Sequence, residues 1–175
     1  MEHILLIDDD EGLIHFLSRF FQRKGYRVTA CSDGRQAIKK IHEERFDLIL
    51  LDYKMPEING LDTLTAIKDI EIKTPVILMT AYGTTDLAIE AMKRGAYDYL
   101  VKPFERKDLS RIVNEALQVN RQMKEVVRLP AAEVPPDESR NGSALQIIGS
   151  SRKMQEIYKR IGQVAEKDVP VLITG

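Results

Sequence analysis

The sequence predicts an α/β fold built around a parallel β-sheet. Over about residues 1–104, short apolar runs alternate with segments whose apolar residues recur at helical spacing. Continuous apolar runs such as Ile4–Ile7 and Leu48–Leu51 are typical of strands buried on both faces. Repeated strand–helix units of this size favour right-handed crossovers, which place successive strands parallel in one sheet.

Five such units are expected in order along the chain. The predicted strands are Ile4–Ile7, Tyr26–Ala30, Leu48–Leu51, Val76–Met79 and Tyr97–Val101. Gly25 and Gly95 supply stop signals for the first and fourth helices, and the fifth helix is predicted to begin near Glu105. One known winding of five units has the strand order 2-1-3-4-5, but periodicity alone does not fix the order.

The fifth helix is predicted to extend over residues 106–129, past the edge of a domain that covers residues 1–120. Its apolar residues fall at alternating spacings of three and four, a heptad stripe of roughly three repeats: Leu109, Ile112, Ala116, Val119, Met123 and Val126. This pattern predicts a coiled-coil homodimer. The alternative is a single helix packed on its own domain.

Two further segments follow this helix. Residues 130–143 combine prolines, a glycine and charges without apolar periodicity, which is typical of a flexible linker. Residues 144–175 contain one predicted helix and one predicted strand, too little to bury a core alone. They are interpreted as the incomplete beginning of a second α/β domain.

Composition sets limits on the class of protein. Of 175 residues, 43% are hydrophobic and 30% charged, and the formal net charge is -1, so bulk attraction to nucleic acid or to an anionic membrane is not expected. Cys31 is the only cysteine, which excludes an intrachain disulfide. No export signal and no apolar run of roughly 20 residues is found, so a cytoplasmic protein without a membrane partner is predicted.

Polar residues stand at the end of four predicted strands. Asp8 and Asp9 follow the first strand, Asp52 follows the third, Thr80 the fourth and Lys102 the fifth. The carboxyl ends of parallel strands meet at one edge of a sheet, where ligands bind. Carboxylate oxygens with water and a backbone carbonyl are the ligands that Mg²⁺ prefers. A pocket for a divalent cation and a phosphoryl group is therefore predicted.

Each of these residues also has a purely structural interpretation. A single aspartate after a strand is usually a turn residue or a helix cap, which is the preferred interpretation for Asp10. Taken alone, Thr80 fits a strand residue, Tyr99 a half-exposed strand aromatic and Lys102 a solvated surface group. The coincidence of three carboxylates at converging strand ends favours the pocket.

Four spaced motifs resemble the receiver domain of two-component response regulators, over about residues 1–120. They are Ile-Leu-Leu-Ile-Asp-Asp-Asp from residue 4, Leu-Asp-Tyr-Lys-Met-Pro from 51, Leu-Met-Thr-Ala from 78 and Tyr-Leu-Val-Lys-Pro-Phe from 99. The resemblance implies a flavodoxin-like doubly wound sheet of order 2-1-3-4-5, with Mg²⁺ as cofactor. It also implies a sensor histidine kinase as the partner that donates a phosphoryl group.

Matched residue by residue, the resemblance assigns roles to the pocket. Asp52 is the expected phosphoacceptor, and Lys102 binds the phosphate. The expected metal ligands are Asp8, Asp9, Asp52 and the backbone carbonyl of Lys54, with Asp9 the direct ligand. Thr80 and Tyr99 are the expected switch residues. The responding face is formed by the fourth helix, fifth strand and fifth helix, which is an alternative surface for a homodimer.

The end of the chain resembles the start of the ATPase domain of sigma-54-dependent, nitrogen-regulator-type activators. The matching residues are Ile147–Ser151, Met154–Gln155 and Val171–Gly175. In that family the last glycine opens the phosphate-binding Walker A loop, so Gly175 is the one nucleotide-binding residue expected here. This fragment is predicted to catalyse only its own phosphorylation and dephosphorylation at Asp52, without ATPase activity or DNA binding.

The intact protein is expected to act with an ATPase ring, sigma-54 RNA polymerase and DNA. Whether the receiver would repress or assist the ATPase stays open. Three rival functions are weighed: a flavin-binding module, a haloacid-dehalogenase-like phosphohydrolase, and a dimerisation module with an inactive receiver. The first lacks its Gly-, Ser- and Thr-rich phosphate loop, since Asp8–Glu11 occupy that position. The second lacks an aspartate two residues after Asp52, where Lys54 stands.

Overall fold

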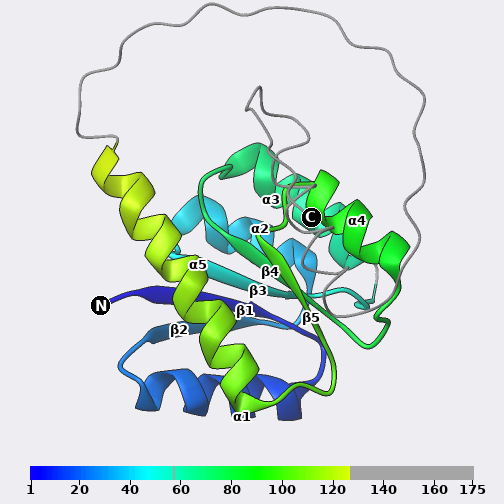
Figure 1. Ribbon diagram of the computed structural model, residues 1–175, viewed down its shortest axis with the longest axis horizontal. Helices are drawn as coiled ribbons and strands as arrows, with labels where there is room; N and C mark the ends of the chain where they lie inside the picture. The colour runs from blue at the N-terminus through cyan, green and yellow to red at the C-terminus, as the bar shows by residue number, and fades with distance from the viewer. Residues whose placement is uncertain (57, 127–175) are drawn as a thin grey trace, which may run out of the picture.

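The computed structural model describes residues 1–56 and 58–126, with side chains described as far as residue 121 (Figure 1). The predicted linker 130–143, the predicted second domain 144–175 and Gly175 lie outside the described residues. In the described part, no helix has the length and apolar character needed to cross a membrane.

Five parallel strands form one sheet, in the order β2-β1-β3-β4-β5 (Figure 1). The strands are β1 His3–Ile7, β2 Arg27–Cys31, β3 Leu48–Asp52, β4 Val76–Thr80 and β5 Asp98–Val101. The helices are α1 Glu11–Arg23, α2 Gly34–Glu43, α3 Gly60–Ile70, α4 Thr85–Lys93 and α5 Arg106–Val126. The predicted fold class and strand order are confirmed, although β2 and β5 each begin one residue later than predicted.

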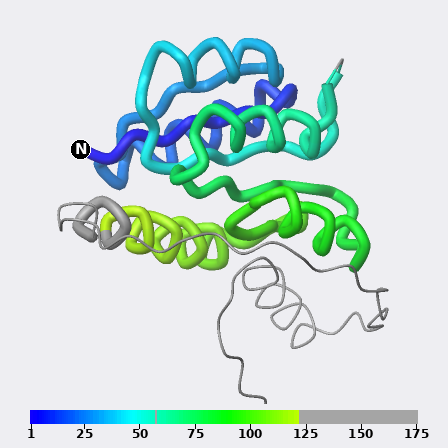
Figure 2. The backbone as a smooth tube through the Cα atoms, turned by 90° about the horizontal axis from the view of Figure 1, so that it is seen from above, coloured from blue at the N-terminus to red at the C-terminus, as the bar shows by residue number. Residues whose placement is uncertain are grey.

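The helices cover both faces of the sheet, and the chain can be followed through the layers in Figure 2. On one face, α2, α3 and α4 pack on alternate strand residues such as Leu5, Ile49 and Leu78. On the other face, α1 and α5 pack on residues such as Leu6 and Leu50. Strands β1, β3 and β4 are therefore buried along their whole length, which explains their continuously apolar sequences.

Helix ends follow the local chemistry of the sequence. The Asp10 side chain accepts a hydrogen bond of 3.0 Å from the Leu13 amide and caps α1, which confirms the structural interpretation of Asp10. Gly25 and Gly95 adopt φ angles of 85° and 88° after α1 and α4, where a side chain would be strained. Both predicted stop signals are confirmed.

The structure corrects part of the predicted dimer stripe on α5. Leu109, Ile112 and Ala116 are no more than 5% exposed, because they pack with α1 against the sheet of their own subunit. These three side chains are therefore not available to a second helix. Their burial agrees with the alternative interpretation, in which the helix packs on its own domain. Val119 is half-buried, and the side chains of Met123 and Val126 lie outside the described set.

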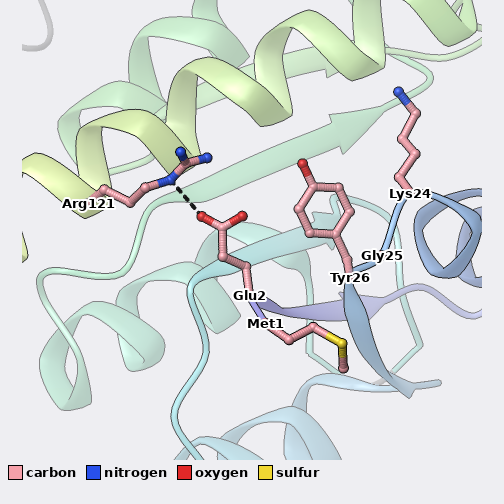
Figure 3. Close-up of a pocket in the computed structure, with 6 residues that line it drawn as sticks. All are labelled: Met1, Glu2, Lys24, Gly25, Tyr26 and Arg121. Atoms are coloured by element: carbon pink, nitrogen blue, oxygen red, sulfur yellow. Dashed lines mark hydrogen bonds and ion pairs between the residues drawn. The ribbon is translucent and has the colours of Figure 1, made fainter.

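Polar contacts also fix α5 to the amino-terminal end of the sheet, and Figure 3 shows the contact of Arg121 with Glu2. The Arg121 Nε donates to Glu2 over 2.8 Å, and the Tyr26 hydroxyl donates to Asn114 over 3.2 Å. Glu2, Tyr26 and Arg121 line an open depression of about 460 Å³, together with Met1, Lys24 and Gly25. The depression lies at the end of the sheet opposite to the carboxyl ends of the strands.

Ala116→Glu is expected to unfold the domain rather than only to separate a dimer. The substitution places a charge in a site with no exposed surface, so we expect a loss of unfolding free energy of about 4 kcal/mol or more. Urea unfolding measures the loss, and Gln118→Glu on the exposed side of α5 is the control. A variant with parental stability but altered oligomeric mass would show that this stripe acts between subunits.

Candidate functional site

The register of the sheet brings the predicted polar residues to one edge. Ile7 pairs with Leu51, so the residues that follow them, Asp8 and Asp52, leave the sheet side by side. On the other side of β3, Thr80 ends β4 in register with Val101 of β5. The next residue, Lys102, donates its backbone N–H to the Thr80 carbonyl over 2.7 Å.

One lysine joins the two buried aspartates. The Lys102 Nζ lies 2.8 Å from Asp8 Oδ2 and 2.6 Å from Asp52 Oδ1. The side chains of Asp8 and Asp52 are 1% and 6% exposed, whereas that of Lys102 is 22% exposed and reaches solvent. Two carboxylates therefore share a single ammonium group at the bottom of the site.

The second oxygen of each buried carboxylate accepts a backbone hydrogen bond. The Asp10 amide donates to Asp8 Oδ1 over 3.0 Å, and the Lys54 amide donates to Asp52 Oδ2 over 2.9 Å. These four contacts fix both carboxylates before any ligand arrives. The sequence had suggested neither amide contact, since any residue type offers a backbone N–H.

The pKa values of Asp52 and Lys102 reflect the competing effects of burial and of neighbouring charges. Burial raises the pKa of Asp52, and the neighbouring charge of Asp8 raises it further, against the opposing effect of Lys102. Burial alone would lower the pKa of Lys102, but its hydrogen bonds to Asp52 and Asp8 outweigh burial and raise it. The lysine is thus held positive, while the carboxylates lack one compensating charge.

The residues present fit a divalent cation. Oxygen atoms of Asp8, Asp9 and Asp52 all lie within 4.8 Å of one another, and Asp9 is exposed at the mouth of the site. All three offer hard carboxylate oxygens, which suit Mg²⁺. The Lys54 amide contacts Asp52, whereas the expected role of the Lys54 carbonyl as a metal ligand stays a prediction.

Thr80 is the last residue of β4, at the edge of the sheet that carries the acidic group, and Tyr99 lies on β5 opposite Leu78. Thr80 is 1% exposed, and its Oγ1 accepts a hydrogen bond of 2.9 Å from the Tyr82 amide. The Thr80 hydroxyl also donates to the Tyr82 carbonyl over 3.4 Å, a long contact. Tyr99 is half-buried against the apolar cluster below α2, α3 and α4, and this burial raises its pKa. Their switch roles stay predictions.

Gly60 is a site residue that the sequence did not reveal. A Cβ atom at this position would lie 2.4 Å from the Asp52 carbonyl oxygen and 2.6 Å from Tyr53 Cα. The Gly60 amide donates to the Tyr53 carbonyl over 2.7 Å, so α3 begins directly against the backbone of the acidic site. An Asn-Gly dipeptide such as Asn59-Gly60 is typical of a turn or loop, and this pattern does not reveal such a close approach.

Comparison with known proteins identifies the family. Residues 4–114 match the family described as Response regulator receiver domain. This chain is a response regulator receiver. It is 37% identical over 172 residues to the transcriptional regulatory protein ZraR of Klebsiella oxytoca, and 35% identical over 172 residues to the DNA-binding transcriptional regulator NtrC of Azospirillum brasilense. These alignments cover 98% of this chain but 37% and 34% of the relatives, so the receiver chain spans about a third of their length.

A solved structure supports the comparison. The response regulator protein TrrA from Thermotoga maritima, in complex with Mg(2+)-BeF, has a TM-score of 0.61 to this receiver at 30% identity. The match covers 66% of this chain and 98% of that chain.

Gly60→Ala is expected to weaken divalent-cation binding as well as the fold. The added methyl group must displace the backbone of Asp52 and Tyr53, at a cost of about 1–3 kcal/mol. Titration with Mg²⁺ and urea unfolding measure the two effects. The matched control is Gly25→Ala. Gly25 has open space around it but a φ of 85°, so the added methyl group strains only the backbone. We expect this variant to lose about 1 kcal/mol of stability and to keep the Mg²⁺ affinity of the parent. Equal Mg²⁺ affinity in both variants would contradict this role for Gly60.

Asp52→Asn is expected to raise the thermal unfolding midpoint by a few degrees at pH 7 in buffer free of divalent cations. The pKa of Asp52 is raised in the folded state, so stability is lost as the pH rises from the pKa of the unfolded chain through that of the folded protein. The gain should shrink towards acidic pH, where protonation neutralises Asp52 in the parent as well. Calorimetry at several pH values measures the difference, with the exposed Asp69→Asn as control. A lower midpoint for Asp52→Asn at pH 7 would refute this account.

Proposed function

We propose that this receiver accepts a phosphoryl group on Asp52 from the histidine of a sensor kinase and changes conformation in response. The observation that carries the proposal is the buried pair Asp8 and Asp52 joined by Lys102, beside the exposed Asp9. Such a group provides a fixed nucleophile, a cation for phosphoryl oxygens and ligands for a divalent ion.

The transfer is a displacement at phosphorus. A carboxylate oxygen of Asp52 forms the new P–O bond as the P–N bond to the kinase histidine breaks, and the electron pair of that bond returns to the imidazole. Bound Mg²⁺, held by Asp8, Asp9, Asp52 and the Lys54 carbonyl, would offset negative charge on the phosphoryl oxygens. Lys102, already 2.6 Å from Asp52, is placed to move its hydrogen bond onto the phosphoryl group.

The contacts of Thr80 support its proposed role in the response. Its hydroxyl donates to the Tyr82 carbonyl over a long contact of 3.4 Å, and a charged phosphoryl oxygen would be a stronger acceptor. Turning of Thr80 towards Asp52 would draw on the loop that begins at Ala81 and would leave space for Tyr99. Such a switch changes the face made by α4, β5 and α5 through different contacts in two states.

We also propose that the wider protein is a transcriptional regulator of the sigma-54-dependent type. The similarity to ZraR and NtrC supports this proposal, since both relatives are named as transcriptional regulators. In it, residues 144–175 begin the ATPase domain, and the receiver controls an ATPase ring that acts with sigma-54 RNA polymerase on DNA. A homodimer would form through the face of α4, β5 and α5, or through α5 beyond Val119.

Acetyl phosphate labelled at phosphorus is expected to label the parent protein in Mg²⁺ and to leave Asp52→Asn unlabelled. Asp69→Asn controls for the loss of a carboxylate elsewhere, and a chelator should abolish labelling of the parent. Equal label in Asp52→Asn would exclude Asp52 as the acceptor. Steady hydrolysis of a generic phosphate ester would favour a phosphohydrolase, and a failure of the parent to bind beryllofluoride would favour an inactive receiver.

A further inference from the structure

We propose that the ion pair between Asp62 of α3 and Arg94 at the end of α4 couples occupancy of Asp52 to the position of α4. This inference rests on the proposed function, because it requires an occupant at Asp52. It describes a route through the backbone of the acidic site that does not pass through Thr80 or Tyr99.

The first step of the route is a direct backbone contact. Gly60 is the first residue of α3, and it lies so close to the backbone of Asp52 and Tyr53 that there is no space for a Cβ atom. A shift of this backbone by a few tenths of an ångström therefore moves the first turn of α3 as well. Close-packed contacts of this kind transmit displacement rather than absorb it.

The second step lies within the first turn of α3. The Asn59 Oδ1 accepts a hydrogen bond of 3.0 Å from the Asp62 amide and caps the helix. The Asn59 Nδ2 donates to Asp62 Oδ2 over 2.8 Å, so both the backbone and the carboxylate of Asp62 are held by the cap. The orientation of the Asp62 carboxylate is thus set by the first turn of α3, which contacts the backbone of Asp52.

The third step crosses from α3 to α4. The remaining oxygen of Asp62, Oδ1, accepts a hydrogen bond of 2.9 Å from an Arg94 NH group. The Nε of the same guanidinium donates to Glu90 Oε1 over 2.8 Å, one turn earlier in α4. Because the guanidinium is planar and both contacts are short, a movement of α4 away from α3 must break one of them.

Arg94 lies at the junction between α4 and β5, so its contact with α3 affects the position of α4. It caps the carboxyl end of α4, and Gly95 then turns the chain with a φ of 88° into β5. An Asp62–Arg94 pair that is intact here therefore favours the present place of α4. Both side chains are partly exposed, 59% for Asp62 and 32% for Arg94, so the expected effect on the equilibrium is modest, about two- to fivefold.

The test is a cycle of beryllofluoride affinities in Mg²⁺, followed by fluorine NMR, for the parent, Asp62→Asn, Arg94→Gln and the double variant. If occupancy breaks the pair, each single variant should bind about two- to fivefold more tightly than the parent. The double variant should bind no more tightly than either single. Arg94→Lys, which keeps the charge but not the planar fork, should fall between the parent and Arg94→Gln.

The cycle separates this coupling from a long-range charge effect. Asp62→Asn removes a negative charge and Arg94→Gln a positive one, so a simple field effect would move their affinities in opposite directions and would overturn the proposal. Glu2→Gln and Arg121→Gln neutralise an ion pair of 2.8 Å at the far end of the sheet, and their cycle should show no coupling to beryllofluoride.

Two further outcomes have distinct meanings. Equal affinity of all four Asp62 and Arg94 proteins would overturn the coupling while leaving the proposed function intact. A parent that does not bind beryllofluoride would overturn the proposed function, and this coupling with it. Hydrogen exchange at the amides of α4 gives a second readout, which should rise in Arg94→Gln before ligand is added and change little further with beryllofluoride.

Discussion

The sharing of one ammonium group by two buried carboxylates is the constraint on which the site depends. A carboxylate removed from water needs a compensating charge or hydrogen bonds, and Lys102 supplies both to Asp8 and Asp52. Yet one positive charge cannot balance two negative ones, and burial together with the neighbouring charge of Asp8 keeps the pKa of Asp52 raised. The folded protein thus holds a site whose electrostatics improve when a divalent cation binds.

The parallel sheet makes this arrangement possible with few residues. Each strand delivers its last side chain to the same edge, and the register sets which of these side chains are neighbours. After β1 the chain turns at once into α1, which Asp10 caps, and after β3 it returns so that Gly60 begins α3 against the backbone of Asp52. The buried strands β1, β3 and β4 hold the side chains at their carboxyl ends in fixed positions, so the functional residues and their loops are attached to a rigid sheet.

The sequence predicted those parts of the structure that depend on local pattern. Apolar runs gave the buried strands, and glycines after α1 and α4 gave the helix ends, since these features depend on residues near in the chain. The meeting of Asp8, Asp9, Asp52, Thr80 and Lys102 at one edge followed from the geometry of parallel strands, whereas their roles came from the resemblance and their individual contacts from neither. The bridging of Asp8 by Lys102 and the approach of Gly60 to Asp52 join elements whose spacing no periodicity encodes.

The heptad stripe of α5 shows why a correct pattern can lead to a wrong surface. A stripe of apolar residues at spacings of three and four predicts that one face of the helix is buried, but not what buries it. Here the sheet and α1 cover Leu109, Ile112 and Ala116, because α5 lies on its own domain for most of its length. The pattern was therefore satisfied within the subunit over these turns.

The same packing restricts how a signal can leave the domain through α5. The helix is held by its apolar face and also by the contacts of Tyr26 with Asn114 and of Glu2 with Arg121. As far as residue 121 it is thus part of the rigid body of the receiver. A change at Asp52 that reaches a partner subunit has two physical routes: movement of the α4 side of the domain, or rotation of α5 together with the whole receiver. A rigid rotation by itself carries no information about Asp52, so in the proposed function the step that responds to Asp52 begins outside α5, in α4 and the loops around Asp52.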